Sequence, residues 1–184
     1  MTLKARRRVA VCVLAVVVPL TVGALGSAQA GTPPSVALLT DVQVADLGTF
    51  DRVTFVFRGG TPVVLDVSYF SGPAFLDPSD LPLEPPLLGN ARFELVLSNA
   101  SGFDLTAPTF VDTYPGPDRI QPNLPGLVDL ALLGDFEAVM QWAFGLPDGE
   151  VAATVTVLSS PTRVVVDIPH PAPRPVVARP TFTG

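Results

Sequence analysis

Proline density is the feature that most restricts the fold of this chain. Twenty of its 21 prolines follow residue 30. A proline has no backbone N–H donor and breaks the interior of a helix, so this density disfavours long helices over residues 31–184. Between the prolines the sequence is rich in Val, Phe and Thr, the residue types that favour strands. The composition therefore predicts an all-β protein.

The N-terminal segment has the pattern of a secretory signal peptide. Residues 1–8 carry one lysine, three arginines and no acid. Residues 9–22 are almost wholly apolar, and the segment ends Ser27-Ala28-Gln29-Ala30. A basic start, a short apolar core and an Ala-x-Ala exit together predict a signal peptide over residues 1–30.

Cleavage after Ala30 would give an exported chain that begins at Gly31. The apolar run is shorter than the roughly 20 residues of a spanning helix, so we expect no stable membrane insertion after cleavage. An uncleaved signal anchor is the alternative. Both interpretations predict an exported protein, either secreted or associated with the cell envelope.

The exported part is strongly acidic. Without residues 1–30 the basic residues fall from 11 to 7 while all 17 acids remain, so the net charge is about −10. Such a charge argues against nucleic acid and polyanions as partners. The only cysteine, Cys12, lies in the apolar core of the leader, so the exported chain has no thiol chemistry and no disulfide.

Alternating apolar residues predict a single β-sandwich of about eight short strands over residues 38–169, after a linker at 31–37. We expect turns at Gly134-Asp135 and at residues 146–149. A helix is the competing interpretation for residues 135–144, since that stretch also fits a helical pattern. The predicted strands cover residues 39–47, 52–58, 63–70, 92–97, 127–133, 136–144, 151–158 and 163–168.

Two long Pro-rich loops interrupt the strands, at residues 71–90 and 99–126. Loops of this length are often functional or else disordered. The second loop has room for a short strand near Phe110-Val111. The last segment, residues 170–184, reads as an extended Pro-rich tail, and we expect its His170, the only histidine, to be solvated and inert.

Three segments in order carry a family resemblance. Residues 49–57 read Thr-Phe-Asp-Arg-Val-Thr-Phe-Val-Phe, residues 134–139 read Gly-Asp-Phe-Glu-Ala-Val before Trp142-Ala-Phe-Gly-Leu, and residues 163–168 read Arg-Val-Val-Val-Asp-Ile. This set resembles the AMIN-like domain of exported actinobacterial proteins. It spans almost all of residues 38–169, although the Pro-rich insertions at 71–90 and 107–125 are long.

The resemblance implies a β-sandwich relative of the AMIN domain that accompanies N-acetylmuramoyl-L-alanine amidases and secretin-type envelope proteins. There it acts as a non-catalytic targeting module associated with peptidoglycan. We therefore expect a monomeric, non-enzymatic module that binds peptidoglycan. The alternative is a domain that binds an envelope protein through its exposed sheet edges or its tail.

The residues offer little for catalysis. A zinc amidase needs several His and carboxylate ligands, and a Ser–His triad needs a histidine in the folded domain. We therefore expect no catalytic residue, no metal and no cofactor. A remote alternative is a glycosidase or Ca²⁺ site built from the loop acids Asp77 and Asp80, or from Asp112 and Asp118.

Two sets of residues are candidates for ligand binding. Asp51 and Arg52 could pair with Arg163 and Asp167 on the closing strand, or an arginine fork could bind a stem-peptide carboxylate. Trp142 is expected in the core, but an exposed aromatic ring would stack on a sugar. Tyr69 and Tyr114 are the other ring candidates, and Tyr114 is the one we expect to be exposed.

Overall fold

The computed structural model describes residues 7–8, 35–104, 106, 109 and 111–171. Every regular element in this part of the chain is a strand, which confirms the predicted all-β class. No described helix is long and apolar enough to cross a membrane. Apart from residues 7–8, 170 and 171, the predicted leader and the predicted tail lie outside the described residues.

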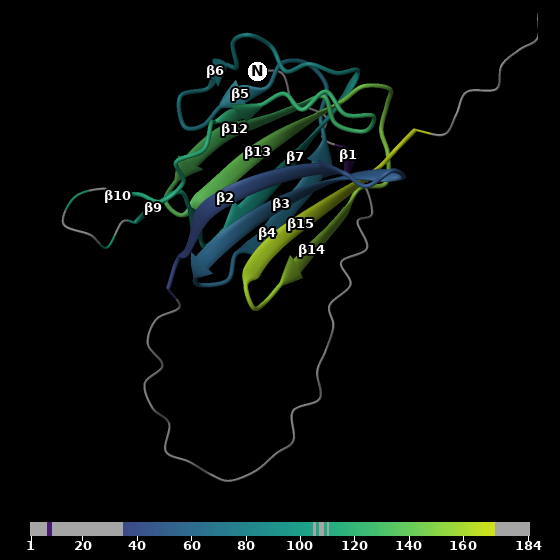
Figure 1. Ribbon diagram of the computed structural model, residues 1–184. Helices are drawn as coiled ribbons and strands as arrows, with labels where there is room; N and C mark the ends of the chain where they lie inside the picture. The colour runs from purple at the N-terminus through teal and green to yellow at the C-terminus, as the bar shows by residue number, and fades with distance from the viewer. Residues whose placement is uncertain (1–6, 9–34, 105, 107–108, 110, 172–184) are drawn as a thin grey trace, which may run out of the picture.

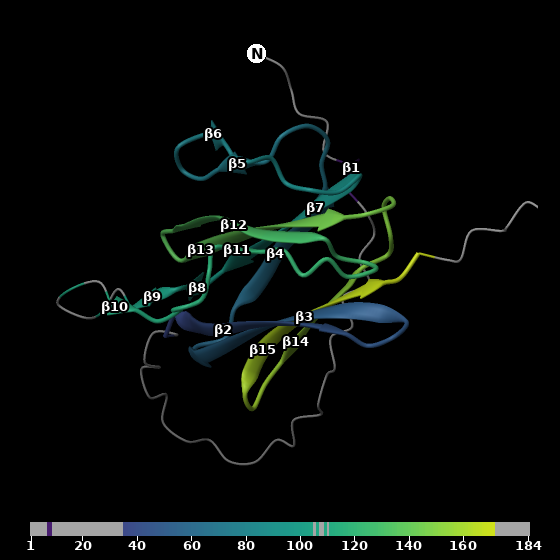
Figure 2. The same cartoon turned by 45° about the horizontal axis from the view of Figure 1, so that its top comes forward.

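The strands form two facing layers, which Figure 2 shows one above the other. The first layer, sheet A, has the spatial order β1 (Arg7–Arg8), β4 (Val63–Tyr69), β7 (Ala91–Ser98), β13 (Val139–Leu146), β12 (Asp129–Phe136) and β11 (Arg119–Ile120). The second layer, sheet B, has the order β14 (Thr154–Leu158), β15 (Thr162–Pro169), β3 (Phe50–Gly59), β2 (Ala37–Asp46) and β8 (Ala100–Ser101). All neighbours pair antiparallel except β2 and β8.

The main hydrophobic core lies between the two sheets. Because side chains alternate along a strand, each sheet turns one apolar face inward. The ring of Phe55 on β3 lies 5.2 Å from that of Trp142 on β13, and Phe93 on β7 stacks on Phe144 at 4.3 Å. The first pair crosses between the sheets and the second joins neighbouring strands of sheet A, so aromatic residues from distant parts of the sequence pack together in the core.

The eight predicted strands correspond to the eight strands of five or more residues, namely β2, β3, β4, β7, β12, β13, β14 and β15. Residues 135–144 form no helix, so that alternative is wrong. The turn predicted at Gly134-Asp135 is also wrong. Gly134 lies within β12, and the chain turns at Glu137 and Ala138, whose φ angles are 52° and 58°. A two-residue hairpin turn of this kind requires positive φ at both central residues.

The two Pro-rich loops contain ordered elements. Residues 71–90 include the short hairpin β5 (Phe75–Leu76) and β6 (Leu81–Pro82), which lies over the outer face of sheet A (Figures 1 and 2). Residues 99–126 include β8, β11 and a second hairpin of β9 (Phe103–Asp104) with β10 (Val111–Asp112). The short strand predicted near Phe110-Val111 matches β10, although Phe110 itself is outside the described residues.

Candidate ligand-binding cleft

The loop of residues 70–90, which covers the outer face of sheet A, is held in place by arginine side chains. Arg92, on β7, donates hydrogen bonds to the carbonyl oxygens of Leu87, Gly72 and Gly89 at 3.2–3.3 Å. One guanidinium therefore ties both ends of the loop to the sheet. Its fork of five N–H donors suits several carbonyl acceptors at once.

A buried ion pair holds the same loop from the other side. Arg119, on β11, donates to both carboxylate oxygens of Asp129 at 3.0 and 2.6 Å, and to the carbonyls of Pro85 and Pro86. Asp129 is fully buried and also accepts the backbone N–H of Leu88 at 2.8 Å. Because a buried carboxylate is costly unless it is paired, this pair fixes the loop against β12.

The loop backbone lies directly on the sheet at two glycines. A Cβ at Gly145 would collide with the carbonyl oxygen of Leu88, and a Cβ at Gly134 would lie 2.8 Å from the Cβ of Asp77 and 2.9 Å from its carbonyl oxygen. Only glycine permits such a close approach. Under the loop a second apolar cluster contains Ala74, Leu87, Ala131, Leu133 and Ala143, with Phe70 and Leu83 packed against it.

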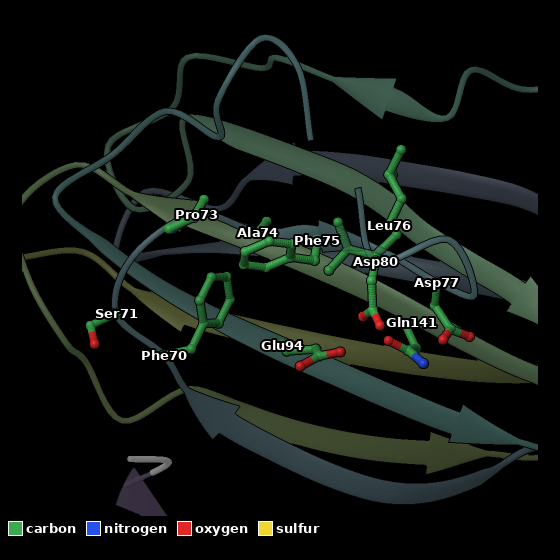
Figure 3. A pocket seen from close by; sticks show the side chains of 11 residues that line it. Phe70, Ser71, Pro73, Ala74, Phe75, Leu76, Asp77, Asp80, Glu94 and Gln141 are labelled. Atoms are coloured by element: carbon green, nitrogen blue, oxygen red, sulfur yellow. The ribbon is translucent and has the colours of Figure 1, made fainter. Parts of the chain in front are cut away.

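A cleft of about 230 Å³ opens between this loop and the outer face of sheet A (Figure 3). Its floor comes from β7, β12 and β13, through Glu94, Leu133 and Gln141. The remaining lining residues belong to the loop and are Phe70, Ser71, Pro73, Ala74, Phe75, Leu76, Asp77 and Asp80.

The cleft separates apolar and polar groups. Figure 3 shows the rings of Phe70 and Phe75 on one side and the side chains of Asp77, Asp80 and Gln141 on the other. Both rings are half-buried, so each keeps part of its surface open. Ionised carboxylates only accept hydrogen bonds. The cleft therefore suits a ligand with one apolar face and several hydroxyl or amine donors.

The predicted pairing of the charged candidates is half right. Arg52 and Asp167 form a two-pronged pair at 2.7 and 2.8 Å, across the register that joins β3 to β15. This pair raises the pKa of Arg52. Arg163 does not pair with Asp51: it lies opposite Val56, and its buried Nε has no hydrogen-bond partner in the described structure.

Asp51 instead organises the end of the domain. One oxygen of its fully buried carboxylate accepts the backbone N–H groups of Gly126 and Leu127 at 2.6 and 2.9 Å. The other lies 2.7 Å from His170 Nε2, and Asp46 lies 3.7 Å from the same nitrogen. These three side chains are close enough to hold a metal ion. The expectation of a solvated His170 is wrong, since its side chain is only 15% exposed.

The three ring candidates are buried, so none of them offers a face to a sugar. Trp142 is fully buried, as expected for a core residue. Tyr69 donates its hydroxyl to Val151 O and accepts from Val151 N, at 2.7 and 2.8 Å. The predicted exposure of Tyr114 is wrong: it is 7% exposed, donates to Pro117 O, and burial raises its pKa to about 12. The backbone after Tyr114 folds back over the Tyr114 ring, so closely that a Cβ at Gly116 would lie 2.5 Å from that ring.

The two pairs of loop acids lie in different cavities. Asp77 and Asp80 line the cleft, together with Glu94, which the sequence reasoning missed. Asp112 and Asp118 line a second cavity of about 340 Å³ near Tyr114, together with Asp135. Burial raises the pKa of Asp135, although hydrogen bonds from Gly102 N and Ser101 Oγ oppose that rise.

The sequence did contain a signal for the missed cleft residues. Glu94 and Gln141 stand at the polar positions of two alternating strands, and both strands lie in the centre of sheet A. A polar side chain on a central strand, opposite a long loop, marks the floor of a covered face. Phe70 and Phe75 flank the Ser-Gly-Pro turn that begins the loop.

The fold and the cleft define a small two-layer β module with an ordered loop over one face. The chain belongs to the AMIN-like domain family, whose model matches residues 37–170. It matches no curated protein and no solved structure. Family membership associates the protein with the cell envelope, where such domains are generally binding modules rather than enzymes.

Proposed function

We propose that the protein is an exported, non-catalytic module that binds peptidoglycan in the cleft between the 70–90 loop and sheet A. The observation that carries this proposal is the presence of half-buried aromatic rings and hydrogen-bond acceptors in one ordered cleft. Sugar rings present an apolar face and a rim of hydroxyl donors, which is the complement of such a lining. Membership in an envelope-associated family supports the same target.

The ligand would bind without help from a basic patch. Asp77 and Asp80 accept hydrogen bonds from hydroxyl or amine groups, while Phe70 and Phe75 pack on the apolar face of a pyranose. The exported chain carries a net charge of about −10. The cleft would therefore recognise the hydroxyl and amine donors of the glycan rather than the carboxylates of the stem peptide.

The proposal does not place the ligand at Arg52. Both prongs of its guanidinium already bind Asp167, so a stem-peptide carboxylate would have to displace that partner. The rings of Trp142, Tyr69 and Tyr114 are excluded by burial.

Cosedimentation with insoluble peptidoglycan tests the proposal. The exported protein, isolated as its cells process it, is mixed with sacculi at low and moderate salt. Phe75→Ala, Asp80→Asn and Gln141→Ala are each expected to weaken the apparent affinity, measured from the bound fraction at several sacculus concentrations, by about tenfold, the loss of one well-placed contact. Binding should survive moderate salt, because ring packing and hydrogen bonds from uncharged hydroxyl groups are weakly screened.

Asp118→Asn is the matched control, since Asp118 is an exposed loop acid that lies outside the cleft. It is expected to bind as the unchanged protein does. Protein that remains wholly in the supernatant, or equal losses for Asp118→Asn and Asp80→Asn, would contradict the proposal. Release of soluble glycan fragments from the sacculi would show catalysis and contradict its non-catalytic part.

A further inference from the structure

The outer edge of β4 accepts a strand in this structure. β4 pairs with β7 along one side. On its other side it pairs antiparallel with β1, with Arg7 opposite Tyr69 and Arg8 opposite Ser68. In the described part of the chain these two arginines are the only residues paired with that edge. Free strand edges carry unpaired N–H and C=O groups and bind other extended chains readily.

The present occupant cannot stay on β4 in an exported protein. Arg7 and Arg8 belong to the basic start of the predicted leader, ahead of the apolar run of residues 9–22. Cleavage of the leader removes them. If the apolar run instead remained in the membrane, the basic end would stay on the cytoplasmic side while the domain lay on the other side. Export, which is part of the proposed function, therefore opens the edge.

The open edge is short and acidic. The register of β4 on β7 shifts between Val64 and Asp66, and a bulge of this kind blocks continued pairing. The usable edge is therefore Asp66–Tyr69. Ser68 binds the carboxylate of Asp66 at 2.8 Å and lies opposite Glu94. A residue opposite Ser68 on an added strand would share its face with both acids.

We propose that the Asp66–Tyr69 edge of the exported domain binds an extended, basic segment of another polypeptide by strand addition. Backbone hydrogen bonds would supply affinity, and the row formed by Asp66, Ser68 and Glu94 would select basic side chains. The register of Arg7–Arg8 on β4 shows that the backbone of an extended segment can pair with this edge. A second copy of the domain is a poor occupant, because pairing two such edges brings like charges together.

A peptide with the sequence of residues 4–9, Lys-Ala-Arg-Arg-Arg-Val, is the probe. Mass spectrometry first establishes the N-terminus of the exported protein. Amide hydrogen exchange is then measured residue by residue, with and without the peptide. We expect protection to rise at residues 66–69 but not at β14, which forms an edge of sheet B. Residues 1–30 retained on exported protein that has left the membrane, where Arg7 and Arg8 could still reach β4, would overturn the proposal.

Two changes separate the backbone from the charge. A peptide of the same sequence that is N-methylated at the backbone nitrogens of Arg7 and Arg8 keeps its charge but cannot donate to the edge, so it is expected to give no protection. Asp66→Lys is expected to weaken binding of the original peptide by about tenfold at low salt, whereas Asp118→Asn, at the opposite edge of sheet A, leaves it unchanged. Equal binding of the N-methylated peptide, no protection at millimolar peptide, or dimerisation of the domain in place of peptide binding would overturn the proposal.

The outcome is distinguishable from that of the peptidoglycan test. Phe75→Ala lies in the cleft and should leave peptide binding intact, while Asp66→Lys should leave the sacculus-bound fraction intact. Failure of the peptide alone therefore removes the strand-addition proposal and leaves the proposed function standing.

Discussion

The outer faces of the two sheets show two ways to finish a β layer. Sheet A carries the 70–90 loop over its outer face, fixed by the buried Arg119–Asp129 pair. No described segment lies over the outer face of sheet B in Figure 2, and its most prominent ion pair, Arg52–Asp167, is 40% and 29% exposed. On a covered face the charged groups lose their water and need protein hydrogen-bond partners instead. The segment that covers the face also encloses a cleft. On an open face the charged groups stay in contact with water, and their ion pairs contribute little to the free energy of unfolding.

The largest expected effect comes from breaking the buried pair. Asp129→Asn keeps one acceptor for Leu88 N but leaves the Arg119 guanidinium without its counter-charge. Removing one partner of a buried pair costs about 3–5 kcal/mol. Urea unfolding should show this loss as a lower midpoint with little change in slope. The exposed neighbour Asp118→Asn should change stability by less than about 0.5 kcal/mol, and an equal loss in both variants would mean that burial is not the cause.

The contact between the loop and the sheet gives the next largest effect. In Gly145→Ala the new methyl group meets the carbonyl of Leu88, so the loop or the strand must move. Overpacking of this kind costs about 1–3 kcal/mol. Thermal unfolding measures the loss, and amide exchange should show faster opening at residues 85–90.

Gly149→Ala is the matched control for Gly145→Ala. A Cβ at Gly149 meets nothing within 4 Å, and the residue lies in the turn that follows β13. Its stability should stay the same or rise by up to about 1 kcal/mol, because alanine restricts the unfolded chain. If Gly145→Ala were as stable as this control, the loop would not rest on β13 as described.

The same contrast explains what could be predicted from the sequence. Strands follow local alternation, so all eight long strands were found at nearly correct positions. The β12–β13 turn was misplaced because Gly134 looked like a turn residue, whereas its role is to admit Asp77 from the loop. The cleft is lined by residues more than 40 positions apart in the sequence, such as Asp80 and Gln141, and local patterns do not show that such residues meet at one cavity. Arg52–Asp167 was within reach because both residues stand on strands with clear alternation.

Breaking the exposed pair tests the other half of the comparison. Arg52→Ala removes the two bonds to Asp167 and the contact with the Phe50 ring, whose centroid lies 5.3 Å from the guanidinium carbon. An exposed pair of this kind contributes about 0.2–1 kcal/mol, and salt screens it. The difference in the free energy of unfolding between Arg52→Ala and the unchanged protein should be smaller at high salt than at low salt, as urea unfolding at both salt concentrations would measure. A loss as large as that of Asp129→Asn would remove the distinction between the two faces.

The smallest expected effect compares the two ends of one strand, β12. Asp129 meets an arginine, whereas the described donors to Asp135 are the neutral groups Gly102 N and Ser101 Oγ. Burial therefore raises the pKa of Asp135 above the ordinary aspartate value of about 4. When the pKa of a carboxyl is higher in the folded than in the unfolded state, the folded state is favoured most at a pH below the unfolded pKa. This contribution to stability is lost as the pH rises through the folded pKa. Asp135→Asn should therefore gain stability relative to the unchanged protein between pH 3 and pH 7, as urea unfolding across that range would measure. Parallel pH profiles for the two proteins would mean that hydrogen bonds from neutral donors hold a buried carboxylate as well as an arginine does.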